Sequence, residues 1–384
     1  MGLGEKIERQ MNSKIQMVDL KGQYQRIKSE IDRAIQEVLA STAFIQGPQV
    51  QQFADALKNY VGAGFCIPCA NGTDALQIAM MALELKPGDE VILPVHTYVA
   101  TAEVIALLGL TPVFIDVHAD TFNLDVDQLE KKITSKTKAI VPVHLYGQCA
   151  DMEPILTIAK NHDLFVIEDV AQALGSVYTF SDGSKKKAGT MGTIGTTSFF
   201  PSKNLGCYGD GGAIFTNDSA LAEKIKMMAN HGQRIKYYHE VIGVNSRLDT
   251  MQAAILLVKL KYLDEYETSR RAVADYYDKS LGGIPQIKIP VRAKTSTHVF
   301  HQYTLQVGKR DELKKYLESK DISTMIYYPV PLHFQKAYKQ SRFEEGSFPV
   351  TENLSKRVIS LPIHTEMKTE ELEYIASQIK VFYA

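Results

Sequence analysis

One lysine stands in a sequence context that suits covalent chemistry. Lys203 lies within residues 198–206 (Ser-Phe-Phe-Pro-Ser-Lys-Asn-Leu-Gly), just past an apolar stretch and flanked by hydroxyl groups and glycine. If a turn buries this amine, desolvation lowers its pKa and makes it nucleophilic near neutral pH. Such an amine forms an imine with a carbonyl compound and can then carry a proton. The alternative, which is commoner for a lone lysine in a turn, is a solvated side chain.

A pair of acidic residues ends another apolar run. Residues 164–167 (Leu-Phe-Val-Ile) are followed by Glu168 and Asp169. Ligands of open α/β sheets bind beyond the carboxyl ends of strands, so a carboxylate here could pair with a protonated ring nitrogen of a cofactor. Because side chains alternate along a strand, Asp169 is the expected partner and Glu168 should face the opposite way. Both acids could instead cap or solvate the next turn.

A third feature suits a phosphate group. Residues 70–76 (Ala-Asn-Gly-Thr-Asp-Ala-Leu) form a small polar turn before an apolar helical pattern. The free N–H groups of a helix start, its dipole and the Thr73 hydroxyl would bind an anion. The competing interpretation is an ordinary helix start capped by Thr73 or Asp74. Each feature is weak alone, but turn, acid and lysine follow one another in the order that a pyridoxal-phosphate site needs.

Alternating helices and strands must position these residues. Helical patterns are predicted over residues 23–39, 50–60, 75–85, 100–108, 126–133 and 152–161. Short continuous apolar runs predict strands over residues 90–93, 112–116, 139–143 and 164–167. Such runs are typical of strands buried on both faces of a parallel sheet. The alternation therefore predicts α/β units with right-handed crossovers.

The pattern changes beyond residue 190. Strands are predicted over residues 196–200, 212–216, 303–307 and 323–328, and helices over residues 248–276, a stretch that could contain a break, 311–319 and 369–382. Three regions are expected: an N-terminal arm prone to disorder over residues 1–17, a large domain over residues 18–250 and a small C-terminal α/β domain over residues 251–384.

Composition narrows the class of protein. The 384 residues carry 43 Lys and Arg against 44 Asp and Glu, so no global field favours nucleic acid or an anionic membrane. Apolar runs are much shorter than the roughly 20 residues of a membrane span, and no secretory signal pattern is seen. Four cysteines give no disulfide framework, and His96, His144 and His231 lack metal-ligand spacing. We expect a cytoplasmic protein with no metal, nucleic acid or membrane partner.

Taken together, the motifs resemble those of the DegT-type family of sugar aminotransferases over nearly the whole chain. The motifs that carry the resemblance are residues 71–76, 168–172 (Glu-Asp-Val-Ala-Gln), 198–203, 209–212 (Gly-Asp-Gly-Gly) and 245–249 (Asn-Ser-Arg-Leu-Asp). The resemblance implies the α/β fold of PLP-dependent transferases of fold type I. In that fold, helices sandwich the mostly parallel sheet of a large domain, and a smaller C-terminal α/β domain follows. Dehydratases of the family replace the lysine by histidine, so Lys203 favours transamination.

The resemblance also implies roles for single residues. Lys203 is expected to hold pyridoxal 5'-phosphate (PLP) as a Schiff base, with Asp169 at the ring nitrogen. The other expected coenzyme contacts are Gln172 beside the ring, Tyr98 stacked on the ring, and Gly72, Thr73 and Ser198 at the phosphate.

Two further residues are expected to act on a second copy of the chain. The resemblance implies that Asn245 reaches the coenzyme phosphate of a partner subunit and that Arg247 reaches the substrate there. It thus implies a homodimer with shared active sites. From the residues alone, Arg247 suits a carboxylate or a phosphate because its guanidinium is a planar fork.

Within the family, the chain looks most like enzymes that convert UDP-2-acetamido-2-deoxy-3-oxo-glucuronate to the 3-amino sugar for bacterial surface polysaccharide. Glutamate is the expected amino donor. Tyr327 precedes Tyr328 and Pro329 where many relatives have histidine, at a position near the sugar. An alternative substrate is therefore a neutral 3-keto or 4-keto sugar on dTDP or GDP. A non-catalytic sugar-sensing protein on the same fold is the more distant alternative.

Overall fold

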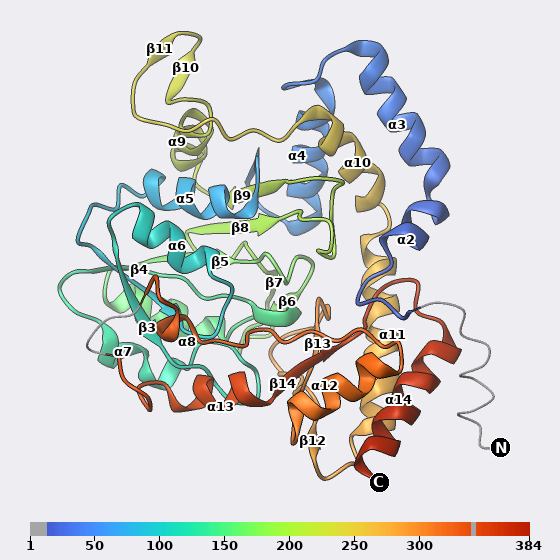
Figure 1. Ribbon diagram of the computed structural model, residues 1–384. Helices are drawn as coiled ribbons and strands as arrows, with labels where there is room; N and C mark the ends of the chain where they lie inside the picture. Colours follow the sequence, from blue (N-terminus) through green and yellow to red (C-terminus); the bar gives the residue numbers. More distant parts are fainter. Residues whose placement is uncertain (1–13, 339–342) are drawn as a thin grey trace.

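The computed structural model describes residues 14–338 and 343–384. It contains a large mixed sheet covered by helices and a small antiparallel sheet with helices of its own (Figure 1). Of the expected N-terminal arm, residues 1–13 lie outside the described residues. Ile15 is buried, pairs in parallel with Ile322 and packs into the apolar cluster around the small sheet.

Within the described residues, three helices precede the first strand: α2 (Leu20–Arg26), α3 (Lys28–Ser41) and α4 (Pro48–Val61). The sequence predicted one helix over residues 23–39, but the non-helical backbone of Ile27 divides it (φ −115°, ψ 18°). Both α3 and α4 pack against α10 (Thr250–Leu260), so this N-terminal region is joined to residues far along the chain.

The large sheet has seven strands among the residues that the structure describes. Their spatial order is β1 (Phe65–Cys69), β9 (Gly212–Thr216), β8 (Ile194–Ser198), β5 (Phe165–Asp169), β4 (Thr137–Ile140), β2 (Glu90–Pro94) and β3 (Thr111–Ile115). Pairing is parallel from β8 to β3 and antiparallel between β8 and β9 and between β9 and β1. The predicted, mostly parallel sheet is confirmed, whereas β1 was not predicted.

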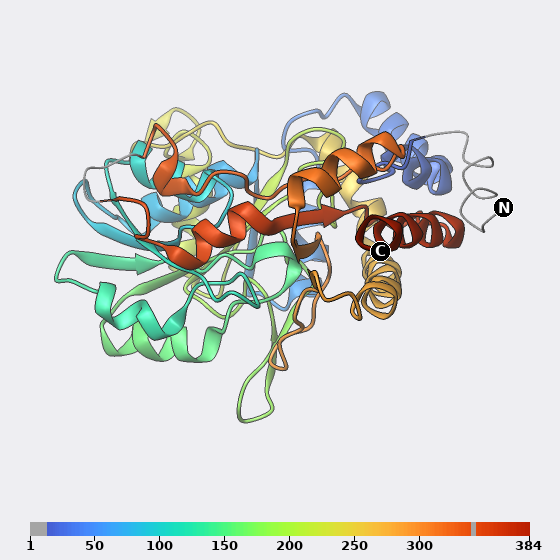
Figure 2. The ribbon, with the colours of Figure 1, turned by 60° about the horizontal axis from the view of Figure 1, so that its bottom comes forward.

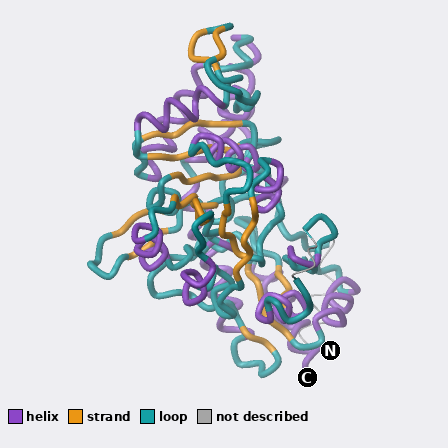
Figure 3. The backbone as a smooth tube through the Cα atoms, turned by 90° about the vertical axis from the view of Figure 1, so that its left-hand side faces the viewer, coloured by secondary structure: helices purple, strands orange, loops and turns teal. Residues whose placement is uncertain are grey.

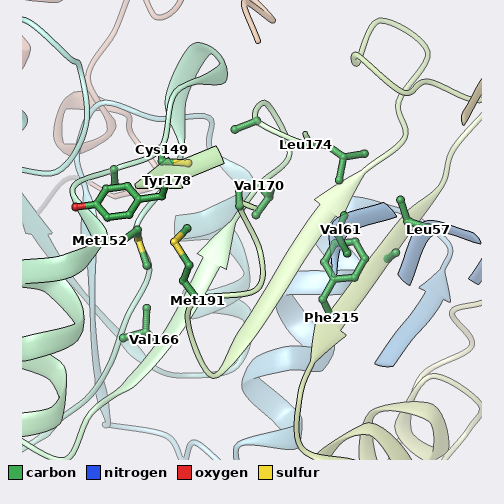
Figure 4. Packing of buried hydrophobic residues seen from close by; sticks show 14 of the residues in the cluster. Leu57, Val61, Cys149, Met152, Val166, Val170, Leu174, Tyr178, Met191 and Phe215 are labelled. Carbon is green, nitrogen blue, oxygen red and sulfur yellow. The ribbon is translucent and has the colours of Figure 1, made fainter. Parts of the chain in front are cut away.

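Helices cover both faces of this sheet. One face packs against α5 (Gly72–Ala82), α6 (Ala100–Leu107) and α9 (Ser219–Met228). The other face packs against α4, α7 (Leu129–Lys132) and α8 (Met152–Asn161). Figure 4 shows this second layer, in which Leu57 and Val61 of α4 lie beside Phe215 of β9, and Met152 of α8 near Val166 of β5. Burial of these apolar side chains is the main stabilising term that holds the strand ends in place.

The small sheet comprises β12 (Ile287–Lys288), β13 (Tyr303–Val307) and β14 (Val358–Leu361), all antiparallel. Its helices are α11 (Leu263–Leu281), α12 (Arg310–Ser319), α13 (Pro349–Arg357) and α14 (Thr369–Tyr383) (Figure 2). The predicted strand over residues 323–328 is wrong, because only Met325 forms a bridge, with Ser360 of β14. Ile326, Tyr327 and Tyr328 instead pack on a buried cluster that includes Tyr146 and Leu354.

Short elements complete the described chain: β6 (Val177–Thr179), β7 (Lys185–Lys187), β10 (Gln233–Ile235), β11 (Tyr238–His239), η1 (Val126–Gln128), η2 (Leu145–Gly147) and η3 (Leu332–Phe334). The β10–β11 hairpin extends from the end of the molecule opposite to the C terminus (Figures 1 and 3). Ile235, Tyr237, Tyr238 and Ile242 are highly exposed on and beside this hairpin. None of the described helices is both long and apolar enough to span a bilayer.

Candidate active site

A cavity of about 680 Å³ lies at the carboxyl ends of the parallel strands, where open α/β sheets bind ligands. Asp169 ends β5, Ser198 ends β8, and Tyr98 follows β2. The sequence-predicted residues that line this cavity are Gly72, Thr73, Tyr98, Asp169, Gln172, Ser198, Lys203 and Tyr327. The fold thus brings together side chains that are spread over most of the sequence.

The loop that carries Lys203 is held from several sides. The Asn204 side-chain amide donates to the carbonyl of Val299 (3.0 Å). The buried amine of Lys259, on α10, donates to the carbonyl of Gly206. These contacts fix the segment directly after Lys203, and the Lys203 side chain lines the cavity.

The Lys203 amine is desolvated without being neutralised by an acid. Burial lowers the pKa of Lys203 to about 8, and the nearby negative charge of Asp169 opposes this shift only in part. Both side chains line the cavity, yet within the described chain they form no ion pair. The separation leaves room for a ligand that would contact the amine at one end and the carboxylate at the other.

This lowered pKa predicts the pH dependence of coenzyme capture by the unloaded protein. Only the neutral amine attacks a carbonyl carbon, so the rate constant with pyridoxal phosphate should rise about tenfold per pH unit from pH 6 and level off above about pH 8. Stopped-flow absorbance measures this rate, and Lys203→Ala is the control that should show no capture. A rate that still climbs tenfold between pH 9 and 10 would indicate an ordinary exposed lysine instead.

The two acids of β5 take opposite faces of the sheet, as strand alternation predicts. Asp169 faces the cavity, where its Oδ2 accepts the Thr101 hydroxyl (2.9 Å) and its Oδ1 accepts the Ala171 N–H (3.1 Å). Glu168 is fully buried on the other face and accepts four hydrogen bonds. The donors are Nε2 of His144 and the N–H groups of Gly189, Met191 and Gly192.

The histidines noted in the sequence lie outside the cavity lining. Nδ1 of His144 accepts the N–H of Ala150 (3.0 Å), so Nε2 carries the proton that is shared with Glu168. His96 is buried beside the Tyr146 hydroxyl, and burial lowers its pKa to about 4. No cluster of three or more histidine, cysteine, aspartate or glutamate side chains suited to a metal ion occurs in the described ranges.

The turn before α5 presents unused hydrogen-bond donors. Asn71 caps the helix, because its Oδ1 accepts the N–H of Asp74 (2.8 Å). The interpretation that Thr73 or Asp74 provides the cap is therefore wrong. In the part of the chain that the structure describes, the N–H groups of Gly72 and Thr73 have no partner. The helix start, the Thr73 side chain and Ser198 face the same cavity and together suit a phosphate.

Two glycines let the sheet approach this turn closely. A Cβ on Gly72 would lie 2.6 Å from Cβ of Ser198, which is closer than real side chains come. A Cβ on Gly212, the first residue of β9, would collide with the carbonyl of Asn71. The turn and the ends of β8 and β9 are therefore packed backbone to backbone.

Aromatic side chains and one glutamine form the opposite wall. Tyr98 is 58% exposed and its ring centroid lies 6.2 Å from that of Tyr328. Gln172 is oriented at both ends: its Oε1 accepts the Tyr146 N–H (2.7 Å) and its Nε2 donates to the Tyr328 hydroxyl (3.2 Å). An exposed ring and a fixed amide on one wall suit a flat ligand lying against them.

Among the lining residues that sequence reasoning did not single out are His301, Gln302 and Tyr328. His301 is nearly buried, and burial together with the positive charge of Lys203 keeps its pKa well below the usual range. His301 and Gln302 precede β13, so they belong to the small sheet, which the local motifs did not connect with the cavity. The pair of histidines at positions 298 and 301 was the available signal.

Asn245 and Arg247 lie outside this cavity. Asn245 is exposed and pairs with Asn230 through an antiparallel bridge. Arg247 is half-buried and lines a separate cavity of about 450 Å³ between α4, β1 and α9. Within one chain, the structure therefore does not bring these two predicted residues to Lys203.

The residues present fit PLP. The ring nitrogen and the aldehyde of PLP lie at opposite ends of its ring, which matches an amine and a carboxylate that share a cavity without an ion pair. Unpaired donors at the start of α5 lie in the same cavity for the phosphate. The fold and the site thus define a PLP-dependent enzyme.

The chain belongs to the DegT/DnrJ/EryC1/StrS aminotransferase family, whose model matches residues 25–380. It is 47% identical to the UDP-2-acetamido-2-deoxy-3-oxo-D-glucuronate aminotransferase of Pseudomonas aeruginosa, over 95% of this chain and 99% of the relative. It is also 47% identical to a pleiotropic regulatory protein of Geobacillus stearothermophilus, over 96% and 98% of the two chains. The crystal structure of S. venezuelae DesV in complex with a ketimine intermediate has a TM-score of 0.93 and 39% identity, and covers 97% and 99%.

Other relatives are named as transaminases of dTDP-linked amino sugars, as a UDP-linked 3-aminotransferase and as GDP-perosamine synthase. The protein is therefore a nucleotide-sugar aminotransferase of the PLP-dependent fold, and its cofactor is pyridoxal 5'-phosphate. The names of its relatives include UDP-, dTDP- and GDP-linked sugars, so they define the reaction but not one sugar.

Proposed function

We propose that the protein transfers the amino group of glutamate to C3 of UDP-2-acetamido-2-deoxy-3-oxo-glucuronate, for surface polysaccharide synthesis. The observation that carries this proposal is the 47% identity to the Pseudomonas aeruginosa enzyme of that name over nearly the full length of both chains. Four relatives of 41% identity or more have names that place the amino or keto group at position 3. A 3-keto substrate is therefore favoured over a 4-keto one.

Each lining residue receives a role from its place in the cavity. When bound, the coenzyme supplies an aldehyde that takes up the amino group and a ring that delocalises the electron pair left at the reacting carbon. The Lys203 amine would hold the coenzyme at its aldehyde carbon. Once the incoming amino group has replaced it there, the released amine would move the proton at the substrate carbon. Asp169 retains the proton on the ring nitrogen.

The remaining residues orient the ring. Tyr98 covers one ring face, and Nε2 of Gln172, which donates to Tyr328, has a second hydrogen to offer at the ring edge. The phosphate is bound by the unpaired N–H groups of Gly72 and Thr73 and by the hydroxyls of Thr73 and Ser198.

The charge of the cavity supports a homodimer with shared active sites. Within one chain the lining carries the carboxyl groups of Asp74, Asp169 and Asp210 and one amine, Lys203. A phosphate and the carboxylates of glutamate and a uronate need more positive charge than this. A second copy would supply Arg247 for a carboxylate and Asn245 for the phosphate. The exposed apolar side chains of the β10–β11 hairpin offer a surface for such a contact.

Tyr327 makes the neutral-sugar alternative worth testing. Its side chain lines the cavity, and its carbonyl accepts the hydrogen bond of the Tyr146 hydroxyl, so its backbone is anchored. Where many family members have histidine, this phenol offers a hydrogen-bond donor without the positive charge that would favour a uronate. A neutral 3-keto or 4-keto sugar on dTDP or GDP is therefore the second candidate substrate.

A regulatory role is the other alternative, raised by the relative from Geobacillus stearothermophilus. A sensing protein would have no need of the desolvated Lys203 amine facing Asp169. That pair supports turnover as the activity of this chain.

A substrate panel tests the proposal. The holoenzyme and glutamate are offered UDP-2-acetamido-2-deoxy-3-oxo-glucuronate, the matching neutral 3-keto UDP sugar, and neutral 3-keto and 4-keto dTDP sugars. We expect kcat/KM for the uronate to exceed that for its neutral analogue at least about tenfold, since one carboxylate–arginine contact contributes about 1.5 kcal/mol or more. Mass spectrometry of the products measures this. Reaction with neutral 4-keto sugars alone would refute the uronate assignment.

A further inference from the structure

A buried hydroxyl contacts the carboxylate of Asp169 from behind the cavity. Oγ1 of Thr101 lies 2.9 Å from Oδ2 of Asp169, and Thr101 is only 1% exposed. An ionised carboxylate only accepts hydrogen bonds, so the hydroxyl is the donor. Among the described residues, Thr101 is the one side chain that donates to Asp169, and the second donor is the main-chain N–H of Ala171 (3.1 Å).

The backbone of Asp169 is fixed independently of its side chain. Its N–H donates to the carbonyl of Pro142 (3.0 Å), and its carbonyl accepts the N–H of His144 (3.0 Å). The main chain therefore determines where the residue lies. The two donors, one on each carboxylate oxygen, determine how its carboxylate plane is turned. Of these two, only the hydroxyl of Thr101 depends on a side chain.

Thr101 also belongs to a segment that forms another part of the site. It is the second residue of α6, and Thr97, Tyr98 and Ala100 just before it line the cavity. Next to it, Ala102 and Val104 are buried in the apolar cluster that packs α6 on the sheet. The segment is therefore firmly seated, and it connects the residue that covers the ring face to the carboxylate at the ring nitrogen.

We propose that Thr101 is a positioning residue that turns the Asp169 carboxylate toward the ring nitrogen of the coenzyme and so maintains the proton there. The proposal rests on the proposed function, in which Asp169 pairs with that nitrogen. A carboxylate has about four acceptor positions, and the two protein donors leave others free for the ring N–H. Hydrogen bonds to a charged group are among the stronger ones in proteins, so loss of this hydroxyl should be measurable at the ring.

The test compares Thr101→Val, which has nearly the same shape but no hydroxyl, with Thr101→Ser, which retains it. Each holoenzyme is loaded with coenzyme labelled with ¹⁵N at the ring nitrogen, and its NMR shift is followed against pH. In Thr101→Val the proton should leave the ring nitrogen about one pH unit or more below the wild-type midpoint. This shift corresponds to a roughly tenfold lower affinity of the ring nitrogen for its proton. Thr101→Ser should restore the wild-type midpoint. If Thr101→Val does not fold, Thr101→Ala serves the same purpose.

A merely structural role predicts a different result. Thr101→Val would then lower the melting temperature of the unloaded protein, while the ring-nitrogen midpoint stayed equal to that of wild type and Thr101→Ser; this outcome overturns the proposal. The variant Asp169→Asn distinguishes a failure of the Thr101 proposal from a failure of the proposed function. If the nitrogen stays protonated in Asp169→Asn, the pairing itself fails. If only Asp169→Asn alters the midpoint, the pairing stands and Thr101 has no part in it.

Discussion

Replacing Lys203 by alanine is expected to lower the rate of transamination at least about 10⁴-fold, equivalent to more than about 5 kcal/mol of transition-state stabilisation. The reason is that the proposed function gives one amine two tasks: holding the coenzyme at its aldehyde carbon and, once released, moving the proton at the substrate carbon. No other amine lines the cavity in the described chain, so nothing nearby can replace it. Single-turnover kinetics with glutamate, followed by coenzyme absorbance, measure the loss.

A mixing experiment provides the control for this variant and also tests the shared site. Lys203→Ala and Asn245→Ala are each expected to be nearly inactive, because each removes a contact from every site. Heterodimers formed from the two would contain one site with both residues intact. Random pairing should then restore about a quarter of wild-type activity, as expected for a two-fold symmetric assembly. Mixtures that remain as inactive as the separate variants would refute active sites built from two chains.

Replacing Asp169 by asparagine is expected to lower kcat about 10²–10³-fold, close to 3–4 kcal/mol, with a much smaller change in KM. Asparagine has nearly the same size but lacks the negative charge that, in the proposed function, retains the proton on the ring nitrogen. The neutral ring then delocalises the electron pair poorly, although Lys203 and the phosphate contacts still bind the coenzyme. Rates of the glutamate half-reaction in stopped-flow absorbance provide the measurement.

Glu168→Gln is the matched comparison for this variant. Glu168 is adjacent in sequence and is also a buried carboxylic acid, but it faces away from the cavity toward His144 and three main-chain N–H groups. Its replacement should lower the free energy of unfolding by about 1–3 kcal/mol while leaving kcat within about tenfold. A larger loss of kcat in Glu168→Gln than in Asp169→Asn would contradict the assignment of faces.

The sequence predicted the structure correctly where a pattern of neighbouring residues was enough to determine a strand or the direction of a side chain. Continuous apolar runs predicted most strands of the large sheet because buried parallel strands leave no polar face. Strand alternation was enough to separate Asp169 from Glu168. The prediction over residues 323–328 was wrong because apolar residues there pack Tyr327 and Tyr328 beside the cavity, and periodicity does not distinguish such a wall from a strand.

Contacts between residues far apart in the sequence could not be predicted from local patterns. His301 and Gln302 meet Lys203 only because the small sheet packs beside the large one. Thr101 resembles any other threonine at a helix start until the end of β5 is placed next to it. The roles expected for Asn245 and Arg247 came from the family resemblance, and within one chain neither residue lines the cavity of Lys203.

The close approach of Gly212 to Asn71, and of Gly72 to Ser198, has an evolutionary consequence. At the phosphate end of the cavity, close main-chain packing leaves no room for a side chain at Gly72 or Gly212, whereas Gln302 and Tyr327 line the cavity with side chains to which no coenzyme contact is assigned. New sugar preferences can thus arise by point mutation without disturbing coenzyme attachment. For redesign, the variable library belongs at Gln302 and Tyr327, and the glycines should be left untouched.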